Sequence, residues 1–388
     1  MAQFTIDTKN LTDLRNKGKL FSSFNSILTR TFFKVSNNEF KILFRGVLGV
    51  SSYTMNISCE CDTPVYFTVD YNKWFNAIQK FNNVNEIILT IKKTMLQISS
   101  VGTSDVINLG IVPFNENSAE ATIINDYLDE RKTSTINDSY QLTLTDELLD
   151  NFKMMDSLFS AQGKVNSIGF TKNYVTYADR SVVVKTNLID TVDDALFATA
   201  EDGMIFVHST FLKLFPMLAK INNSVYYSNE YDTIYWEGEN VRLILTSEPW
   251  DLALPTEEQW EMIKPQDENS SFSVDLATLS SSLKFFTGFY EETAWKPLTF
   301  EIVNGKEVTL YYRHPTTEIS KTLGDIVGTV DGSFIIGSEI LGKILSSIEN
   351  RFSDEEQVVI IYDEDAPGIY CKVNNTYEFV LSKMMDIV

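Results

Sequence analysis

The chain contains 388 residues, of which 44% are hydrophobic and 22% charged, and its formal net charge is −21. This length predicts two or three folded domains. The negative charge argues against a protein that coats nucleic acid with its whole surface, although a small basic face remains compatible with it. No apolar run approaches the roughly 18 residues of a membrane span, so we expect no membrane partner.

A short pattern recurs along the chain: an alternating apolar strand, a polar residue, an amphipathic helix and further strands. It is clearest after segment 67–70, where Trp74, Phe75, Ile78 and Phe81 follow at the spacing of one helix face. The predicted helices cover residues 10–24, 71–81, 146–159, 209–220, 276–287 and 338–351. The strands that precede them begin near residues 4, 67, 141, 204, 272 and 334, so the repeat length is 62 to 74 residues.

The repeats predict an α+β fold with paired units. One helix covers one sheet face, so a single repeat buries little, whereas two repeats make a domain of about 120–130 residues. Six repeats then give three domains, separated by an acidic tract and a proline-bearing tract. The predicted division is 1–114, a connector at 115–139, 140–248, a linker at 249–269, and 270–388.

The predicted helices differ in charge from the rest of the chain. They contain eleven Lys and Arg against seven Asp and Glu, a net charge of +4, which leaves −25 for the remainder. Helix faces that share one surface would make that surface mildly basic. Lys is also a good helix former, so solvated lysines alone do not require a function.

This pattern resembles the bacterial-type DNA polymerase sliding clamp, the beta processivity factor family. The closest local similarities are segment 67–70 with its helix, the turn and strand at 175–183, the connector at 249–255 and the tail at 379–385. The chain departs from the family in its long connector 115–139, in Ser382 where the family has proline, and in the absence of glycine beside Asp179. A divergent member, such as one from a large phage, fits these departures.

The resemblance implies three tandem DNA-clamp domains that form a ring, with helices inside and sheets outside. Two chains would join head to tail as a homodimer, and double-stranded DNA would slide through the hole without being read. Lys suits such contacts because it is a flexible point charge. The DNA-facing candidates are Arg15, Lys17, Lys19, Lys73, Lys80, Lys153, Lys213, Lys220, Lys284 and Lys343.

The family also docks short apolar peptides of a DNA polymerase, a clamp loader and other partners. Met adapts well to varied peptides, although Met384 and Met385 could simply close the last sheet. The pocket candidates carried over from the family are Tyr177, Arg180, Val182, Pro249, Leu254, Val380, Leu381, Met384 and Met385.

No motif predicts catalysis, a metal or another cofactor. Cys59 and Cys61 share one strand face, but a zinc site would need about two more ligands. The acidic segment 363–365 reads better as a hairpin turn than as a cation site. His208 precedes Ser209 at a predicted helix entry, which is a more plausible role than catalysis, and His314 with Pro315 indicates a loop. We therefore expect a non-enzyme with free thiols, in the cytoplasm of a bacterial cell or a phage-infected host.

Two further interpretations stay open. A non-catalytic virion or structural protein could also consist of repeated α+β modules, although such a protein has no need for a charge difference between helices and body. A clamp that acts mainly in late transcription is a variant of the first interpretation. An enzyme would need a supported nucleophile–base or carboxylate pair, which the sequence does not offer.

Overall fold

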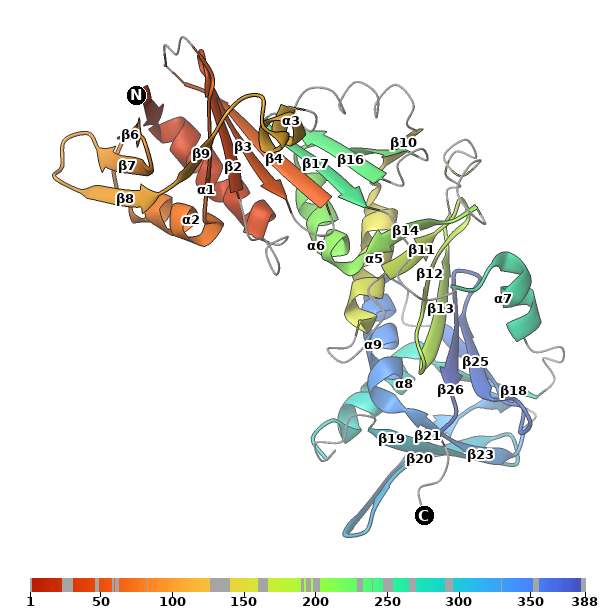
Figure 1. Cartoon of the computed structure of the whole chain (residues 1–388). Coiled ribbons are helices and arrows are strands. Elements are labelled where there is room, and N and C mark those ends of the chain that lie inside the picture. Colours follow the sequence, from red (N-terminus) through yellow and green to blue (C-terminus); the bar gives the residue numbers. More distant parts are fainter. Residues whose placement is uncertain are drawn as a thin grey trace. The chain divides into compact units, whose positions relative to one another are not determined.

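The structure is a computed structural model (Figure 1). The chain forms two compact units: unit 1 consists of Met1–Leu144 and Leu214–Glu248, and unit 2 of Thr145–Lys213 and Pro249–Val388. Each unit is described by itself. The structure describes residues 2–22, 31–45, 49–57, 59, 63–81, 83–125, 140–159, 167–189, 192, 197, 203–228, 233–238, 240–246, 254–264, 270–289, 296–328, 330–351 and 356–384.

Unit 1 contains a four-stranded sheet of order β1-β6-β7-β8 and a nine-stranded sheet of order β10-β15-β16-β17-β4-β3-β2-β5-β9. Its helices are α1 (Thr8–Ser22), α2 (Tyr71–Lys80) and α3 (Ala119–Asn125). Its strands are β1 (Ala2–Asp7), β2 (Thr31–Ser36), β3 (Glu39–Arg45), β4 (Gly49–Asn56), β5 (Val65–Val69), β6 (Glu86–Lys92), β7 (Met95–Ser100), β8 (Val106–Gly110), β9 (Val112–Phe114), β10 (Tyr140–Thr143), β15 (Ser224–Ser228), β16 (Thr233–Gly238) and β17 (Val241–Thr246).

The aromatic core of unit 1 explains the orientation of α2. The ring of Phe33 in β2 stacks on Phe67 in β5 at a centroid distance of 4.8 Å, and Trp74 of α2 lies 5.2 Å from the Phe33 ring. Asp70 caps the helix, because its side chain accepts a hydrogen bond of 2.9 Å from the backbone N–H of Lys73. With Trp74 fully buried, the opposite side of α2 is left exposed.

Unit 2 contains a nine-stranded sheet of order β14-β11-β12-β13-β26-β25-β24-β18-β22 and a four-stranded sheet of order β21-β20-β19-β23. Its helices are α5 (Asp146–Leu158), α7 (Glu257–Ile263), α8 (Leu276–Phe286) and α9 (Ser338–Ile348), which continues as the 3-10 turn η4 (Glu349–Arg351). α6 (Ser209–Leu218) begins in unit 2 and ends in unit 1. The strands of unit 2 are β11 (Ser167–Phe170), β12 (Tyr174–Ala178), β13 (Val182–Asn187), β14 (Ile205–His208), β18 (Ser271–Asp275), β19 (Pro297–Val303), β20 (Glu307–His314), β21 (Thr317–Asp325), β22 (Val327–Gly328), β23 (Gly332–Gly337), β24 (Gln357–Ile361), β25 (Gly368–Val373) and β26 (Tyr377–Ser382).

The predicted α+β repeat is confirmed, since α1, α2, α5, α6, α8 and α9 each follow a strand at the predicted position. Neighbouring repeats exchange their leading strands: β1 pairs with β6 of the second repeat, and β5 pairs with β2 of the first. The nine-stranded sheets arise because β4 pairs with β17 and β13 pairs with β26. The three-domain boundaries stay a prediction, and the two compact units divide the chain differently.

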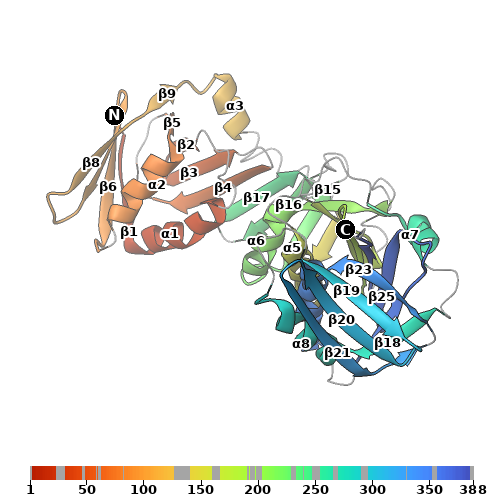
Figure 2. The same cartoon turned by 90° about the horizontal axis from the view of Figure 1, so that it is seen from below.

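Two helices lie where the sequence predicted only connecting segments. α3 falls within the expected connector 115–139, and α7 falls within the expected linker 249–269. In Figures 1 and 2, α1 and α2 cover one face of the unit 1 sheets, whereas α3 lies on the opposite face. Short connector helices therefore cover sheet faces that the six repeat helices leave open.

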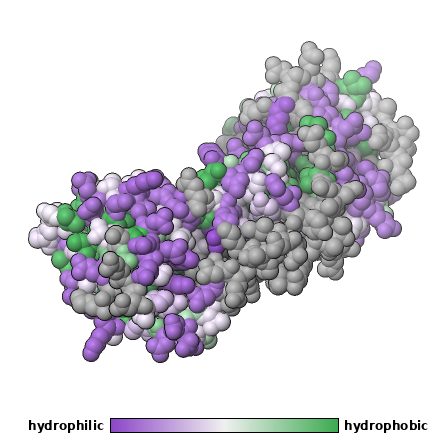
Figure 3. Space-filling model, turned by 90° about the horizontal axis from the view of Figure 1, so that it is seen from above, coloured by the Kyte–Doolittle hydropathy of each residue, from purple (hydrophilic) through white to green (hydrophobic). Residues whose placement is uncertain are grey.

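Hydrophilic residues predominate on the face drawn in Figure 3, and the hydrophobic residues form small separate groups. Among the described residues, no helix is both long enough and apolar enough to cross a membrane. The same residues contain no group of three or more His, Cys, Asp and Glu side chains placed to hold a metal ion.

Candidate nucleic-acid interface and docking surface

The exposed face of α2 carries two of the predicted lysines. Lys73, Asn76 and Lys80 are all exposed and follow one another at three- and four-residue spacing, opposite the buried Trp74. Neither lysine forms an ion pair with another described residue. This face therefore carries two cations that have no ion-pair partner in the described part of the chain, with the polar Asn76 between them.

Two predicted cations of α1, the half-buried Arg15 and the buried Lys17, are held by contacts within unit 1, which corrects the prediction. The Nη2 of Arg15 donates hydrogen bonds to the carbonyls of Ile78 and Phe81 and so satisfies the last turn of α2. Lys17 is only 7% exposed, and its Nζ lies 2.9 Å from Oδ2 of Asp13. Both side chains tie α1 to its surroundings, so neither is available for DNA.

A different lysine of α1 is exposed and was missed by the sequence interpretation. Lys9, Thr12 and Asn16 lie exposed on one face of the helix. Their spacing of three and four residues continues to position 19, whose side chain, that of the predicted Lys19, lies outside the described residues. Positions 9, 12, 16 and 19 share one face of a helix, and this spacing in the sequence would have been enough to predict Lys9 as a DNA-facing candidate.

The remaining predicted lysines are exposed to different degrees. Lys153 on α5 and Lys220, just after α6, are exposed and form no ion pair with another described residue. Three others in unit 2 each face a carboxylate. The Nζ to carboxylate oxygen distances are 3.9 Å for Lys213 and Asp156, 2.9 Å for Lys284 and Glu349, and 3.3 Å for Lys343 and Glu339.

Three pocket candidates lie in the core of unit 2, which is a second correction. Tyr177, Val182 and Leu381 are at most 2% exposed. Tyr177 contacts Phe159, the C-cap residue of α5, with a ring centroid distance of 5.0 Å. Val182 pairs with Leu381 across β13 and β26. Because side chains alternate between faces along a strand, these three pack under the helices and cannot line an outer pocket.

Leu254 and Val380 lie on the opposite face of that sheet, where α7 covers Leu254 and leaves Val380 half-buried. They share a cluster with Tyr174, Met204 and the fully buried Trp260. A Cβ at Gly169 would lie 2.7 Å from Cδ1 of Leu254, so a larger residue there would require the neighbouring side chains to shift. The connector helix therefore fills the outer face that the pocket prediction left open.

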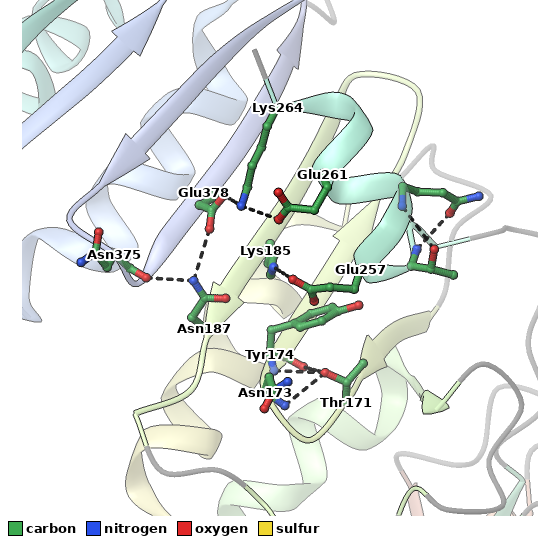
Figure 4. Close-up of polar contacts among 12 residues, drawn as sticks. Thr171, Asn173, Tyr174, Lys185, Asn187, Glu257, Glu261, Lys264, Asn375 and Glu378 are labelled. Atoms are coloured by element: carbon green, nitrogen blue, oxygen red, sulfur yellow. Dashed lines mark hydrogen bonds and ion pairs between the residues drawn. The ribbon is translucent and has the colours of Figure 1, made fainter. Parts of the chain in front are cut away.

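Charged side chains fasten α7 to the sheet, as Figure 4 shows. The Nζ of the buried Lys185 on β13 lies 2.8 Å from Oε1 of Glu257 and 4.6 Å from the ring centroid of Tyr174. At the other end of α7, Lys264 lies 3.5 Å from Oε2 of Glu378. Burial, together with the charge of Glu257, raises the pKa of Tyr174 to about 12.

The α3 helix of unit 1 repeats this arrangement. Its Ala121 packs on Phe32 and Tyr66 of the sheet. Lys34 of β2 donates a hydrogen bond of 2.8 Å to Oδ1 of Asn125 and lies 5.8 Å from the Tyr66 ring centroid. In both units a strand lysine lies over a tyrosine of a neighbouring strand and holds a polar side chain of the connector helix.

The other pocket candidates lie around the end of β26. Arg180 is exposed in the turn after β12, and its carbonyl accepts a 3.0 Å hydrogen bond from the Ser382 hydroxyl. Met384 is half-buried, and its backbone N–H donates to the carbonyl of Ile335 at 2.8 Å. Pro249 and Met385 lie outside the described residues.

A pH dependence follows from Glu378. Burial would raise the pKa of this carboxyl, but the hydrogen bond from Tyr370 and the charge of Lys264 outweigh burial and hold the pKa below its ordinary value of 4.5. A carboxyl with a depressed folded-state pKa stabilises the fold above its unfolded pKa, and this stabilisation is lost as the pH falls through the folded pKa. We expect the free energy of unfolding of the wild type to fall more steeply below about pH 4.5 than that of Glu378→Gln, in urea titrations at several pH values. Parallel profiles would contradict this role.

The repeat architecture is that of a DNA sliding clamp: strand–helix–strand repeats in pairs, whose sheets join from one pair to the next. Three solved bacterial structures share this fold with the chain over its full length. The DNA polymerase sliding clamp of Caulobacter crescentus is 12% identical, with a TM-score of 0.74 and coverage of 99% of this chain and 100% of that chain. The DNA polymerase III subunit beta of Pseudomonas aeruginosa is 12% identical, with a TM-score of 0.73 and coverage of 99% of both chains. That of Borrelia burgdorferi is 14% identical, with a TM-score of 0.68 and coverage of 100% of both chains.

Comparison with protein-family models and with curated proteins gives no match. The similarity is therefore one of fold rather than of sequence.

Proposed function

We propose that this protein is a DNA sliding clamp, a processivity factor that encircles duplex DNA and tethers a replicative polymerase. The observation that carries the proposal is the full-length agreement of the fold with DNA polymerase III beta subunits, at 99 to 100% coverage of both chains. The exposed lysines of α2 support it, since they face away from the sheet on an otherwise acidic protein. The proposed activity is mechanical and involves no catalysed reaction. The same fold agreement favours this function over a virion module, and no observation favours a role in late transcription.

The proposed ring consists of two copies joined head to tail. Among the described strands, β8 pairs only with β7 and β21 pairs only with β20, so each four-stranded sheet ends in an open edge. Apolar side chains are exposed at both edges: Val106 of β8 is 49% exposed, and Phe285, which lies under Lys321 of β21, is 46% exposed. Because the two edges differ, pairing β8 of one copy with β21 of the next is a head-to-tail contact that can close into a ring.

Changing Phe285 and Phe289 to Asp should open the ring. Both side chains are nearly half exposed and contact each other, with ring centroids 5.9 Å apart. Charges at this edge would have to be buried between the copies, which is costly. We expect light scattering to give the monomer mass of 44.2 kDa. The control, Ile189→Asp with Met262→Asp, changes two side chains that are more exposed and should keep the mass of the wild type. If the Phe variant keeps the mass of the wild type, this edge is not the interface between the copies.

We further propose that the polymerase and a clamp loader dock beside α7, at the surface formed by Arg180, Val380 and Met384. The exposure of Arg180 and the partial exposure of the other two support this location. Arg180→Glu with Met384→Asp should abolish stimulation of primer extension by the polymerase of the same genome or host, and the mass of the particle should not change. Lys306→Glu with Val303→Asp, on an exposed hairpin, is the control. Normal stimulation by the first variant would locate the docking surface elsewhere.

We place this function in a reducing cytoplasm, in a bacterial cell or a phage-infected host. Cys371 supports the proposal, since it is a buried free thiol. Burial raises the pKa of the Cys371 thiol, which keeps it protonated and unreactive. The phage origin stays a prediction.

A further inference from the structure

The exposed lysines divide into two classes by their surroundings. Lys73 and Lys80 on α2, and Lys220 after α6, lie in unit 1 and form no ion pair with a described residue. In unit 2, Lys213, Lys284 and Lys343 each lie against a carboxylate. Lys153 is the exception among the predicted lysines of unit 2, since it has no such partner among the described residues.

Two of the paired carboxylates join helices of unit 2. Asp156 of α5 faces Lys213 of α6 at 3.9 Å. Glu349, where α9 passes into η4, accepts hydrogen bonds of 2.9 Å from Lys284 and from Ser280, both of α8. The hydrogen bond from Lys284 is the largest of the effects that hold the pKa of Glu349 below its ordinary value, so this carboxyl is ionised at neutral pH.

Glu339 of α9 is shared by two lysines. Its oxygens lie 3.3 Å from Nζ of Lys343 and 3.1 Å from Nζ of Lys296. Its side chain is 37% exposed and that of Lys343 is 35% exposed, so solvent reaches both. The pair is thus accessible to a phosphate, which would have to compete with a carboxylate already in place.

We propose that Asp156, Glu339 and Glu349 lower the affinity of the helix surface of unit 2 for DNA, so that the unpaired lysines carry most of the phosphate contacts. This rests on the proposed sliding function. A lysine that already pairs with a carboxylate gives up that partner when it binds a phosphate. The exchange therefore adds little to the free energy of DNA binding. The carboxylate also repels the phosphate. A surface of this kind holds DNA weakly, which suits a protein that must move along it.

The test is a triple variant, Asp156→Asn, Glu339→Gln and Glu349→Gln, which keeps the shape of the side chains. It frees the three helix lysines Lys213, Lys284 and Lys343, and also Lys296, which precedes β19. Its probe is a fluorescent 30-base-pair duplex, titrated by anisotropy over a range of salt concentrations. Each additional phosphate contact steepens the slope of log affinity against log salt by about 0.9. We expect binding at least about tenfold tighter at low salt and a slope steeper by up to about 2.7.

The matched control is Glu116→Gln, Glu364→Gln and Asp365→Asn, which removes the same charge from exposed turns. It should bind DNA as the wild type does, because these groups lie outside the six repeat helices. Equal affinity of the triple variant and the wild type would overturn the inference, whether or not stability falls. An equal gain in the control would also overturn it, because the effect would then come from net charge alone. A wild type that does not bind the duplex at low salt would instead overturn the proposed function.

Discussion

Changing Lys73, Lys80, Lys153 and Lys220 together to Glu should abolish the affinity for duplex DNA. These are the predicted lysines that are exposed and unpaired among the described residues. Four phosphate contacts would make the affinity of the wild type fall roughly a hundredfold between about 50 and about 200 mM salt. The variant should lose this salt dependence and bind more weakly than the wild type at about 50 mM. The measurement is the anisotropy titration of the same duplex.

A control of equal charge isolates the position of these lysines. Lys92, Lys93, Lys172 and Lys306 are exposed and lie at strand ends or hairpin turns, and their change to Glu alters the net charge by the same amount. We expect this control to keep most of the affinity. An equal loss of affinity in both variants would mean that DNA binding depends on the net charge of the protein and that the helix faces are not the interface. Circular dichroism of both variants should match that of the wild type, since all these side chains are exposed.

Trp260→Ala should cause the largest loss of stability among single substitutions on α7. Trp260 is fully buried against Tyr174 and Leu254, and α7 has no other buried side chain. Truncating a buried Trp to Ala typically costs about 3–5 kcal/mol, because the apolar contacts are lost and a cavity remains. The carboxylate of Glu257 and the amine of Lys185 would remain paired, but an ion pair with one exposed partner stabilises by only about 1 kcal/mol or less. Urea unfolding should show the loss in the transition of unit 2.

Met262→Ala is the matched control on the same helix. Its side chain is 76% exposed, so we expect a change within about 0.5 kcal/mol. Trp260→Phe should retain part of the stability, since an aromatic ring still fills most of the space. If Trp260→Ala unfolds at the same urea concentration as the control, α7 does not hold to the sheet in solution and the outer face is open. That outcome would leave the face around Leu254 and Val380 open to a docking partner.

The six repeats were predictable because helix and strand periodicities are local. Trp74 and Ile78 mark one face of α2 within a few residues, and Asp70 marks its start. The sequence also contained a readable signal for α7, since Thr256 and Gln259 form a capping box. That α7 packs on Tyr174 was not predictable, because the contact joins segments far apart in the chain.

The site was predictable only in part, for the same physical reason. Lys17 lies three residues beyond Leu14, which is on the buried stripe of α1, so its burial was suggested by the spacing. Arg15 could not be assigned in this way, because its acceptors are carbonyls of α2. For Val182 and Leu381, alternation along a strand shows which residues share a face. Only the pairing of β13 with β26 shows which face lies under the helices.

The central claim is a ring of two chains, and the solution mass together with a low-resolution image of the particle tests it most directly. The account predicts a particle of twice the monomer mass of 44.2 kDa, with a central hole wide enough for duplex DNA. A compact particle of the monomer mass, without a hole at every concentration measured and with or without DNA, would contradict it.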